Sequence, residues 1–175
     1  IEGYPIDSEV ADIDNDGDLD LVLLLQNPAP EPHHIVIMEN AGVDGSGEWL
    51  GFVPDPQTLS MVADLRSLSL GYLNGDAFID VLVANYGAGA VDMYFNAADG
   101  GIGLVSAPSV IVGPFVKAVC AAPDSGFAVD FVVAGGSEGR VWHARHNGAG
   151  VFTPAQSFTG NIPLSVLLKD FDGDK

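Results

Sequence analysis

Residues 12–25 read DIDNDGDLDLVLLL, a loop dense in aspartate that leads directly into an apolar run. Short runs rich in Val, Leu, Ile and Phe that lie between clusters of Gly, Asn, Asp and Pro predict strands. Three more such runs follow: HIVIM from His34, DVLVA from Asp80 and DFVVA from Asp130. No window keeps the apolar spacing of an amphipathic helix over a useful length. The sequence therefore predicts an all-β protein with tight turns.

The pattern around this loop repeats along the chain. The first position of the loop falls at Asp12, Tyr72, Ala122 and Asp170, which lie 60, 50 and 48 residues apart. Each unit is expected to hold four strands, and those of the first unit cover about Ser8–Ile13, Asp20–Gln26, His34–Asn40 and Glu48–Val53. Four antiparallel strands that recur every roughly 40 to 60 residues are typical of β-propeller blades. A β-sandwich with coincidental Asp turns is the alternative.

The predicted blades cover about residues 5–55, 64–112 and 115–160, and a fourth begins at about 163 and runs to 175. Three four-stranded blades cannot close a ring, so strand edges and apolar blade faces would stay exposed. We therefore expect a part of a larger propeller, completed by the remainder of a longer protein, by a partner chain or by a second copy.

The carboxylates of the first loop alternate along a tightly curved backbone and are expected to converge on one point. Convergent oxygens are what a hard cation with six to eight ligands requires. Calcium is the expected cation, because magnesium demands a stricter octahedron and keeps its waters. The candidate ligands are the side chains of Asp12, Asp14, Asp16 and Asp20 and the backbone carbonyl of Asp18.

The first loop does not fit an EF-hand, which needs a bidentate Glu at its twelfth position and a helix on each side. The twelfth position here is Leu23, inside the run LVLLL, and the flanks are predicted strands. A solvated Asp-rich turn that binds no ion remains the alternative.

The second loop, YLNGDAFID over residues 72–80, is a weaker candidate for metal binding. It keeps Asn74, Asp76 and Asp80 at ligand positions. It has Tyr72 at the first position and Ala77 where glycine is expected. Weak calcium binding and no binding are both open for this loop.

The third and fourth loops depart further from the pattern. The third, APDSGFAVD, keeps Asp124 and Asp130 at ligand positions and is predicted to be a metal-free turn. The fourth restarts the pattern with the candidate ligands Asp170, Asp172 and Asp174 and ends before a closing aspartate.

These loops resemble the FG-GAP/VCBS repeat family, whose blades build propellers like the integrin α-subunit head. The resemblance rests on DIDNDGDLDLV, YLNGDAFIDVLV and the degenerate APDSGFAVDFVV, together with the turns ENAG and HNGAG. It implies that calcium is bound in the first loop by Asp12, Asp14, Asp16, Asp18 and Asp20. It also implies an extracellular, luminal or periplasmic protein that serves adhesion, ligand display or scaffolding.

Charge narrows the range of partners. The chain holds 24 Asp and Glu against 6 Lys and Arg, a formal net charge of −18, with 47% apolar residues. So many apolar residues exclude a disordered acidic tail. The negative charge would repel phosphate groups, so neither nucleic acid nor an anionic membrane is an expected partner. Residues 102–123 are largely apolar, but their Pro and Gly residues favour two strands joined by a Gly-Pro turn over a membrane-spanning helix.

No enzymatic constellation is predicted. GGSEG over residues 135–139 matches a nucleophile elbow, but the predicted context is a strand hairpin, so Ser137 is interpreted as a turn residue. Adjacent strand residues point to opposite faces, so His33 and His34 are interpreted as surface histidines rather than joint metal ligands. Trp49, Trp142 and Tyr94 are predicted to pack between blades, with a sugar-stacking surface as the alternative.

The leading hypothesis is a non-enzymatic calcium-binding propeller module for adhesion, recognition or scaffolding, with a protein or a glycan as its ligand. The alternatives are an accessory region of a carbohydrate-active enzyme, a lectin-like sugar-binding propeller and a half-propeller that associates with a second copy.

Overall fold

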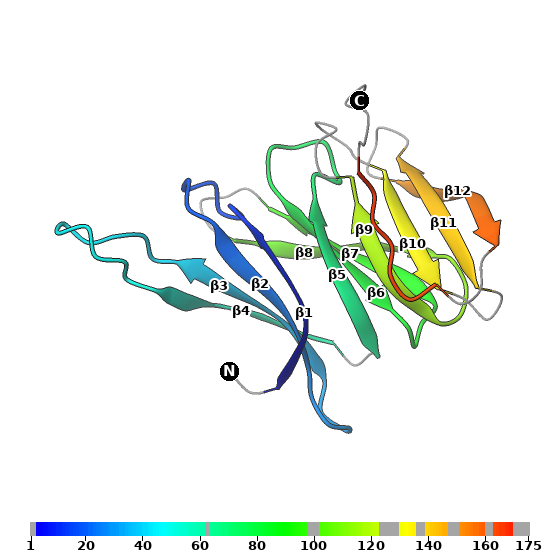
Figure 1. The fold of residues 1–175 in the computed structure, drawn as a ribbon, viewed down its shortest axis with the longest axis horizontal. Coiled ribbons are helices and arrows are strands. Elements are labelled where there is room, and N and C mark those ends of the chain that lie inside the picture. The colour runs from blue at the N-terminus through cyan, green and yellow to red at the C-terminus, as the bar shows by residue number, and fades with distance from the viewer. Residues whose placement is uncertain are drawn as a thin grey trace.

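The computed structural model describes residues 3–61, 64–97, 102–122, 130–135, 139–146, 151–159 and 163–169. The described residues contain twelve strands and no helix, so the prediction of an all-β protein is confirmed. The strands form three antiparallel sheets of four strands each, and each sheet follows the chain order (Figure 1).

Each sheet is a simple up-and-down meander. The first sheet contains β1 (Tyr4–Ala11), β2 (Asp20–Gln26), β3 (His33–Asn40) and β4 (Phe52–Met61). The second contains β5 (Leu65–Gly71), β6 (Asp80–Asn85), β7 (Ala90–Asn96) and β8 (Leu104–Ile111). The third contains β9 (Val116–Ala121), β10 (Phe131–Gly135), β11 (Arg140–His146) and β12 (Phe152–Thr159).

The core lies in two layers, one on each face of the second sheet. Every residue of β6 is buried, which explains its unbroken apolar run. Val81 and Val83 belong to the cluster shared with the first sheet. Leu82 and Ala84 belong to the cluster shared with the third sheet. Because strand side chains alternate between faces, β6 stabilises both junctions between sheets.

The first strands of the three sheets lie side by side, β1 against β5 and β5 against β9. Side chains of one first strand accept hydrogen bonds from the backbone of the next. Glu9 Oε2 accepts the N–H of Leu70 over 3.0 Å, and Ser69 Oγ accepts the N–H of Ala121 over 3.1 Å. Successive sheets are therefore joined by polar contacts at one edge as well as by apolar packing between their faces.

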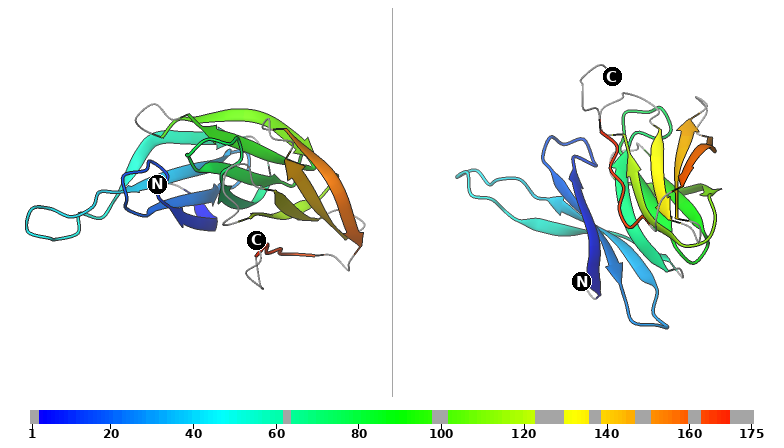
Figure 2. Two further views of the ribbon diagram at one scale, coloured as in Figure 1. Left: turned by 90° about the horizontal axis from the view of Figure 1, so that it is seen from above. Right: turned by 45° about the vertical axis from the view of Figure 1, so that its right-hand side comes forward.

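An extended segment, residues 163–169, continues this series beside β9 (Figure 2). The N–H of Leu168 lies 3.4 Å from Cys120 Sγ on β9. Leu164 and Leu167 are each 70% exposed. Cys120 has a free thiol and is half-buried.

The first sheet differs from its predicted strand bounds. The fourth strand was expected over residues 48–53, but β4 spans Phe52–Met61. It therefore continues past the predicted end of the first blade near residue 55. Gly47 and Gly51 adopt left-handed φ values of 82° and 87°, which interrupt an extended strand. The hairpin between β3 and β4 projects away from the three sheets (Figure 1).

The aromatic residues divide between core and surface. Trp142 and Tyr94 are partly buried against the clusters between sheets, as predicted. Trp49 is 56% exposed on the projecting hairpin, so its predicted packing between blades is wrong. Its indole Nε1–H donates to Asn40 Oδ1 over 2.7 Å, which fixes the ring without burying it.

The prediction of a surface position is also wrong for His33, which is 7% exposed. Its ring contacts β5 in the next sheet, a contact that no local pattern reveals. The two strands expected within residues 102–123 are present as β8 and β9, with Gly113 and Pro114 between them. No helix among the described residues is long and apolar enough to cross a membrane.

Candidate metal centre

The first loop joins β1 to β2, and its own carboxylates hold its backbone in shape. The N–H of Asp16 donates to Asp14 Oδ1 over 3.1 Å, and the N–H of Asp18 donates to Asp16 Oδ1 over 2.8 Å. Gly17 has a left-handed φ of 98°, and its N–H donates to Asp12 Oδ2 over 3.1 Å. These bonds curl the loop, so that carboxylates from its two ends approach one another.

Three of the predicted ligands come together at the centre of this loop. One carboxylate oxygen from each of Asp12, Asp14 and Asp20 lies within 4.8 Å of those of the other two. Burial raises the pKa of Asp14, the hydrogen bond from the Asp16 N–H opposes this, and the neighbouring carboxylates of Asp20, Asp16 and Asp12 raise it further. Like charges held this close repel one another, and a cation between them relieves that repulsion.

The most specific feature of the cluster is a single oxygen. Asp12 Oδ1 is the one buried side-chain nitrogen or oxygen in the described part of the chain that has no hydrogen-bond partner. An unpaired buried acceptor costs about 1–3 kcal/mol, and more when it is charged. Coordination to a cation would supply the missing partner, so these residues fit a metal ion.

Asp20 is an anchor of the fold as well as a candidate ligand. It is fully buried, and its Oδ2 accepts the N–H of Ile13 over 3.0 Å. Its Oδ1 accepts the N–H of Asn40 over 2.8 Å. The carboxylate therefore ties the start of β2 both to the loop before it and to the end of β3.

The structure does not bring all five predicted ligands together. Asp16 and Asp18 are exposed and lie outside the carboxylate cluster. Asp16 Oδ1 is engaged by the N–H of Asp18. Direct coordination by the Asp16 side chain and by the Asp18 carbonyl stays a prediction from the sequence.

No family model and no curated protein matches this chain. The resemblance to FG-GAP/VCBS repeats therefore remains a prediction from the loop residues, and the candidate site rests on its geometry. The cluster offers carboxylate oxygens, which suit hard divalent cations such as Ca²⁺, Mg²⁺ and Mn²⁺ better than soft metals.

Asp80 repeats the anchoring role of Asp20 in the second sheet. Its Oδ2 accepts the N–H of Leu73 and its Oδ1 accepts the N–H of Asn96, each over 2.8 Å. Burial raises the pKa of Asp80 to about 6, although both hydrogen bonds favour the charged form. The two carboxylates hold equivalent positions, at the start of the second strand of each sheet.

The candidate ligands of the second loop are engaged with one another. The amide Nδ2–H of Asn74 donates to Asp76 Oδ2 over 2.7 Å, and the N–H of Asp76 donates to Asn74 Oδ1 over 3.0 Å. The N–H of Phe78 donates to Asp76 Oδ1 over 2.9 Å. Both oxygens of Asp76 thus have partners from the protein, in contrast to Asp12 Oδ1 in the first loop.

Parts of the third and fourth loops lie outside the described residues. This applies to the predicted positions Asp124, Asp170, Asp172 and Asp174, and also to Ser137. Asp130 is described, and its Oδ2 lies 2.8 Å from His143 Nε2, with both side chains partly exposed. The aspartate that precedes the second strand of the third sheet therefore has a side-chain partner that Asp20 and Asp80 lack in the described residues.

Two asparagines join the first loop to the second sheet, and sequence reasoning assigned neither of them a role. The buried Asn96 Nδ2–H donates to the carbonyl oxygen of Ile13 over 2.8 Å. Asn15 Nδ2–H donates to the carbonyl oxygen of Ala77 over 3.3 Å. Asn40 and Asn96 each end the third strand of their sheet, and this recurrence in the sequence is the signal that could have found the first of these contacts.

Proposed function

We propose that this chain is part of a calcium-stabilised β-propeller that serves, without catalysis, as an adhesion, recognition or scaffold module. The observation that carries the proposal is the convergence of Asp12, Asp14 and Asp20, with the buried Asp12 Oδ1 left without a partner. Calcium favours six to eight oxygen ligands in flexible arrangements, which suits a loop of this kind with water as additional ligand.

The order of the strands supports the propeller. Each sheet is a four-stranded meander, and the first strands of successive sheets lie next to one another, as they do around the axis of a propeller. Residues 163–169 contact β9 through Leu168 and Cys120, which is where the first strand of a further blade would be expected. Further sheets, from this protein or from a partner, would complete the ring.

The proposed role of calcium is structural. It would neutralise the repulsion among the loop carboxylates and fix the path from β1 into β2. The same loop is bonded to the second sheet through Asn96 and Asn15, so a rigid loop would also stabilise the junction between the first two sheets. A secreted, luminal or periplasmic location belongs to the proposal, because calcium is abundant in those compartments.

Calorimetric titration of the chelator-treated protein tests this proposal. We expect one calcium per chain. Asp12→Asn should weaken calcium binding by about tenfold or more, because it removes the charge of the carboxylate whose unpartnered oxygen is the proposed ligand. Asp18→Asn removes the same charge from the same loop, outside the carboxylate cluster, and should change affinity by less than about threefold. Equal affinities for the two variants, or no calcium binding at all, would contradict the proposal.

A further inference from the structure

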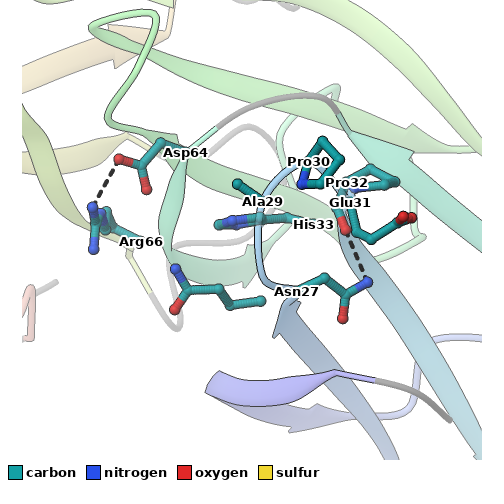
Figure 3. Close-up of a pocket in the computed structure, with 9 residues that line it drawn as sticks. Asn27, Ala29, Pro30, Glu31, Pro32, His33, Asp64 and Arg66 are labelled. Carbon is teal, nitrogen blue, oxygen red and sulfur yellow. Dashed lines mark hydrogen bonds and ion pairs between the residues drawn. The ribbon is translucent and has the colours of Figure 1, made fainter.

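A pocket of about 360 Å³ opens between the first and second sheets (Figure 3). One wall is the turn after β2, residues 27–32, and the other is the start of β5. The residues that matter for its chemistry are Asn27, Pro30, Glu31, His33, Asp64 and Arg66. Gln26 lies at the pocket and Asp20 at the opposite end of β2, so the pocket and the candidate metal centre are separate sites.

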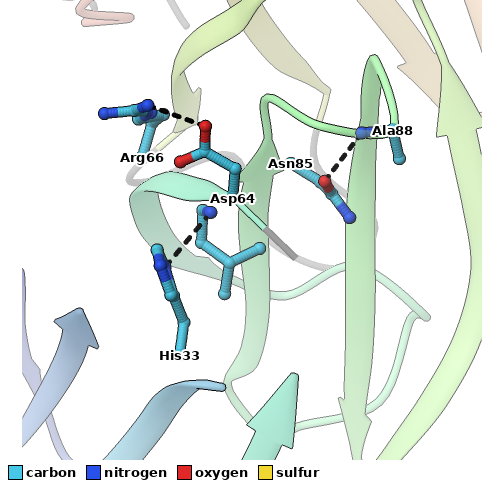
Figure 4. A network of polar contacts seen from close by, with 6 residues as sticks. His33, Asp64, Arg66, Asn85 and Ala88 are labelled. Atoms are coloured by element: carbon cyan, nitrogen blue, oxygen red, sulfur yellow. Dashed lines mark hydrogen bonds and ion pairs between the residues drawn. The ribbon is translucent and has the colours of Figure 1, made fainter. Parts of the chain in front are cut away.

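His33 is a fixed hydrogen-bond donor in this pocket. Its Nδ1 accepts the N–H of Leu65 over 3.3 Å, so the ring proton is on Nε2. Figure 4 shows this contact between the first sheet and the start of β5. Burial lowers the pKa of His33, which keeps the ring neutral near pH 7. The buried ring therefore offers one N–H that cannot readily reorient.

Asp64 and Arg66 form a second fixed group on the opposite wall. Arg66 Nη2 lies 2.7 Å from Asp64 Oδ2, and both side chains are partly exposed. The guanidinium lies over the ring of Tyr86, 4.8 Å from its centroid. The Asp64 carbonyl accepts the N–H of Tyr86 over 2.9 Å. Stacking and the ion pair orient the guanidinium, and its remaining N–H groups and the second Asp64 oxygen can serve a ligand.

The turn of residues 27–32 is closed by its own hydrogen bonds. The N–H of Glu31 donates to the Pro28 carbonyl over 3.1 Å, and Asn27 Nδ2–H donates to the Pro32 carbonyl over 3.0 Å. Pro30 and Pro32 give this wall an apolar surface, and the exposed carboxylate of Glu31 lies beside it. The pocket therefore places planar polar groups beside a rigid apolar wall.

The mixture of groups selects the class of ligand. His33 and Arg66 donate hydrogen bonds, whereas Asp64 and Glu31 accept them. An anionic ligand would be repelled by those two carboxylates and by the net charge of −18. A hydroxyl group both donates and accepts, so a neutral polyhydroxylated ring with an apolar face complements both walls. The volume lies near the lower end of the roughly 300–1,000 Å³ range of small-molecule pockets.

We propose that this pocket binds a neutral saccharide of one or two rings. The inference rests on the recognition role in the proposed function and is independent of its calcium site. The ring hydroxyls would bond to His33 Nε2–H, to the Arg66 guanidinium and to the carboxylates of Asp64 and Glu31, while the apolar ring face lies against the proline wall.

Amide-resolved NMR titration tests the proposal with five defined probes: glucose, galactose, mannose, lactose and maltose. At least one should shift the amide signals of Glu31, Leu65 and Arg66. Arg66→Gln and Glu31→Gln should each weaken that binding about tenfold, since each removes a charged hydrogen-bonding group. Arg145→Gln, which removes an exposed arginine of β11 outside the pocket, should leave the affinity unchanged.

Glucuronate is added as an anionic comparison for glucose. Four outcomes would overturn the proposal: no shift with any of the five sugars, shifts confined to other regions, unchanged affinity in the folded pocket variants, or tighter binding of glucuronate than of glucose. The dispersion of the NMR signals shows whether each variant is folded, and Glu31→Gln changes an exposed side chain while keeping the backbone N–H that closes the turn. Each titration is run in calcium and in EDTA, and calcium binding is followed separately by calorimetry. Failure of the sugar site is thereby distinguished from failure of the calcium site.

Discussion

The side-chain amide of Asn96 donates a 2.8 Å hydrogen bond to the backbone carbonyl of Ile13, 83 residues earlier in the chain. Ile13 lies within the first loop, and Asn96 ends β7 in the second sheet. The N–H of Asn96 donates in turn to Asp80 Oδ1. The carboxylate that anchors the second sheet is therefore connected to the candidate metal centre of the first through one buried side chain.

Asn96→Ala should destabilise the protein by about 1–3 kcal/mol, because the buried Ile13 carbonyl loses its donor. Urea denaturation provides the measurement. Asn40→Ala is the comparison, since Asn40 also ends a third strand, but its side chain bonds to Leu19, Gly42 and Trp49 at exposed or partly buried sites, so its loss should cost less. An Asn96 variant as stable as the wild type would show that this contact does not support the junction between the sheets.

The two-sided burial of β6 predicts that substitutions on either face are costly. Leu82→Ala should lose about 2–5 kcal/mol of unfolding free energy, and Val83→Ala should also lose stability clearly, although less. Each opens a cavity in a different layer of the core. Val105→Ala on β8, where the side chain is 57% exposed, is the control and should stay within about 0.5 kcal/mol of the wild type. A neutral effect of either β6 substitution in chemical denaturation would contradict the packing of sheets on both faces.

The second loop is predicted to hold its shape without metal, because the Asn74 amide bonds to Asp76. Asn74→Asp replaces that donor with a third carboxylate, alongside Asp76 and Asp80. The variant should melt at a lower temperature in EDTA than the wild type and should gain a second, weaker calcium site in calorimetric titration.

Asn74→Ala serves as its control, because it removes the donor without adding a ligand. It should lose stability in EDTA and still bind one calcium. If Asn74→Asp were also to bind one calcium, the asparagine would not be what distinguishes the second loop from the first.

Glu9 connects β1 to β5 and gives the stability a pH dependence. Burial raises its pKa, the hydrogen bond from the Leu70 N–H opposes this, and the Asp7 carboxylate adds to the rise. A carboxyl group whose pKa is higher in the folded state contributes most to the stability of the fold below its unfolded pKa. This contribution is lost as the pH rises through the folded pKa.

Glu9→Gln keeps an oxygen that can accept the Leu70 N–H and removes the buried charge. It should therefore raise the melting temperature near pH 7, and the gain should shrink as the pH falls toward 4. Glu48→Gln, at an exposed turn position, should show no such trend in parallel melting curves. A constant difference between the Glu9 variant and the wild type across this pH range would argue against a raised pKa.

The sequence predicted the elements whose signals are local. The apolar runs after Asp20 and Asp80 are strands, and the alternating carboxylates do converge at Asp12, Asp14 and Asp20. β4 begins later than predicted because Gly47 and Gly51 adopt left-handed φ values. The sequence shows that glycines are present there but does not specify their backbone conformation.

The remaining differences arise from contacts between distant parts of the chain. His33 is buried because β5 packs against it, and Asn96 has its role because it reaches the first loop. Trp49 is exposed because the hairpin that carries it projects from the sheets. None of these relationships is encoded in the local hydrophobic pattern, which identifies strands but not their neighbours in space.

Melting of the intact 18.2 kDa chain with and without calcium is the decisive test of a structural calcium site. We expect that binding of one calcium per chain raises the melting temperature, that EDTA reverses the rise, and that equimolar magnesium does not reproduce it. An unchanged melting curve in calcium and in EDTA, with no calcium bound at equilibrium, would contradict it.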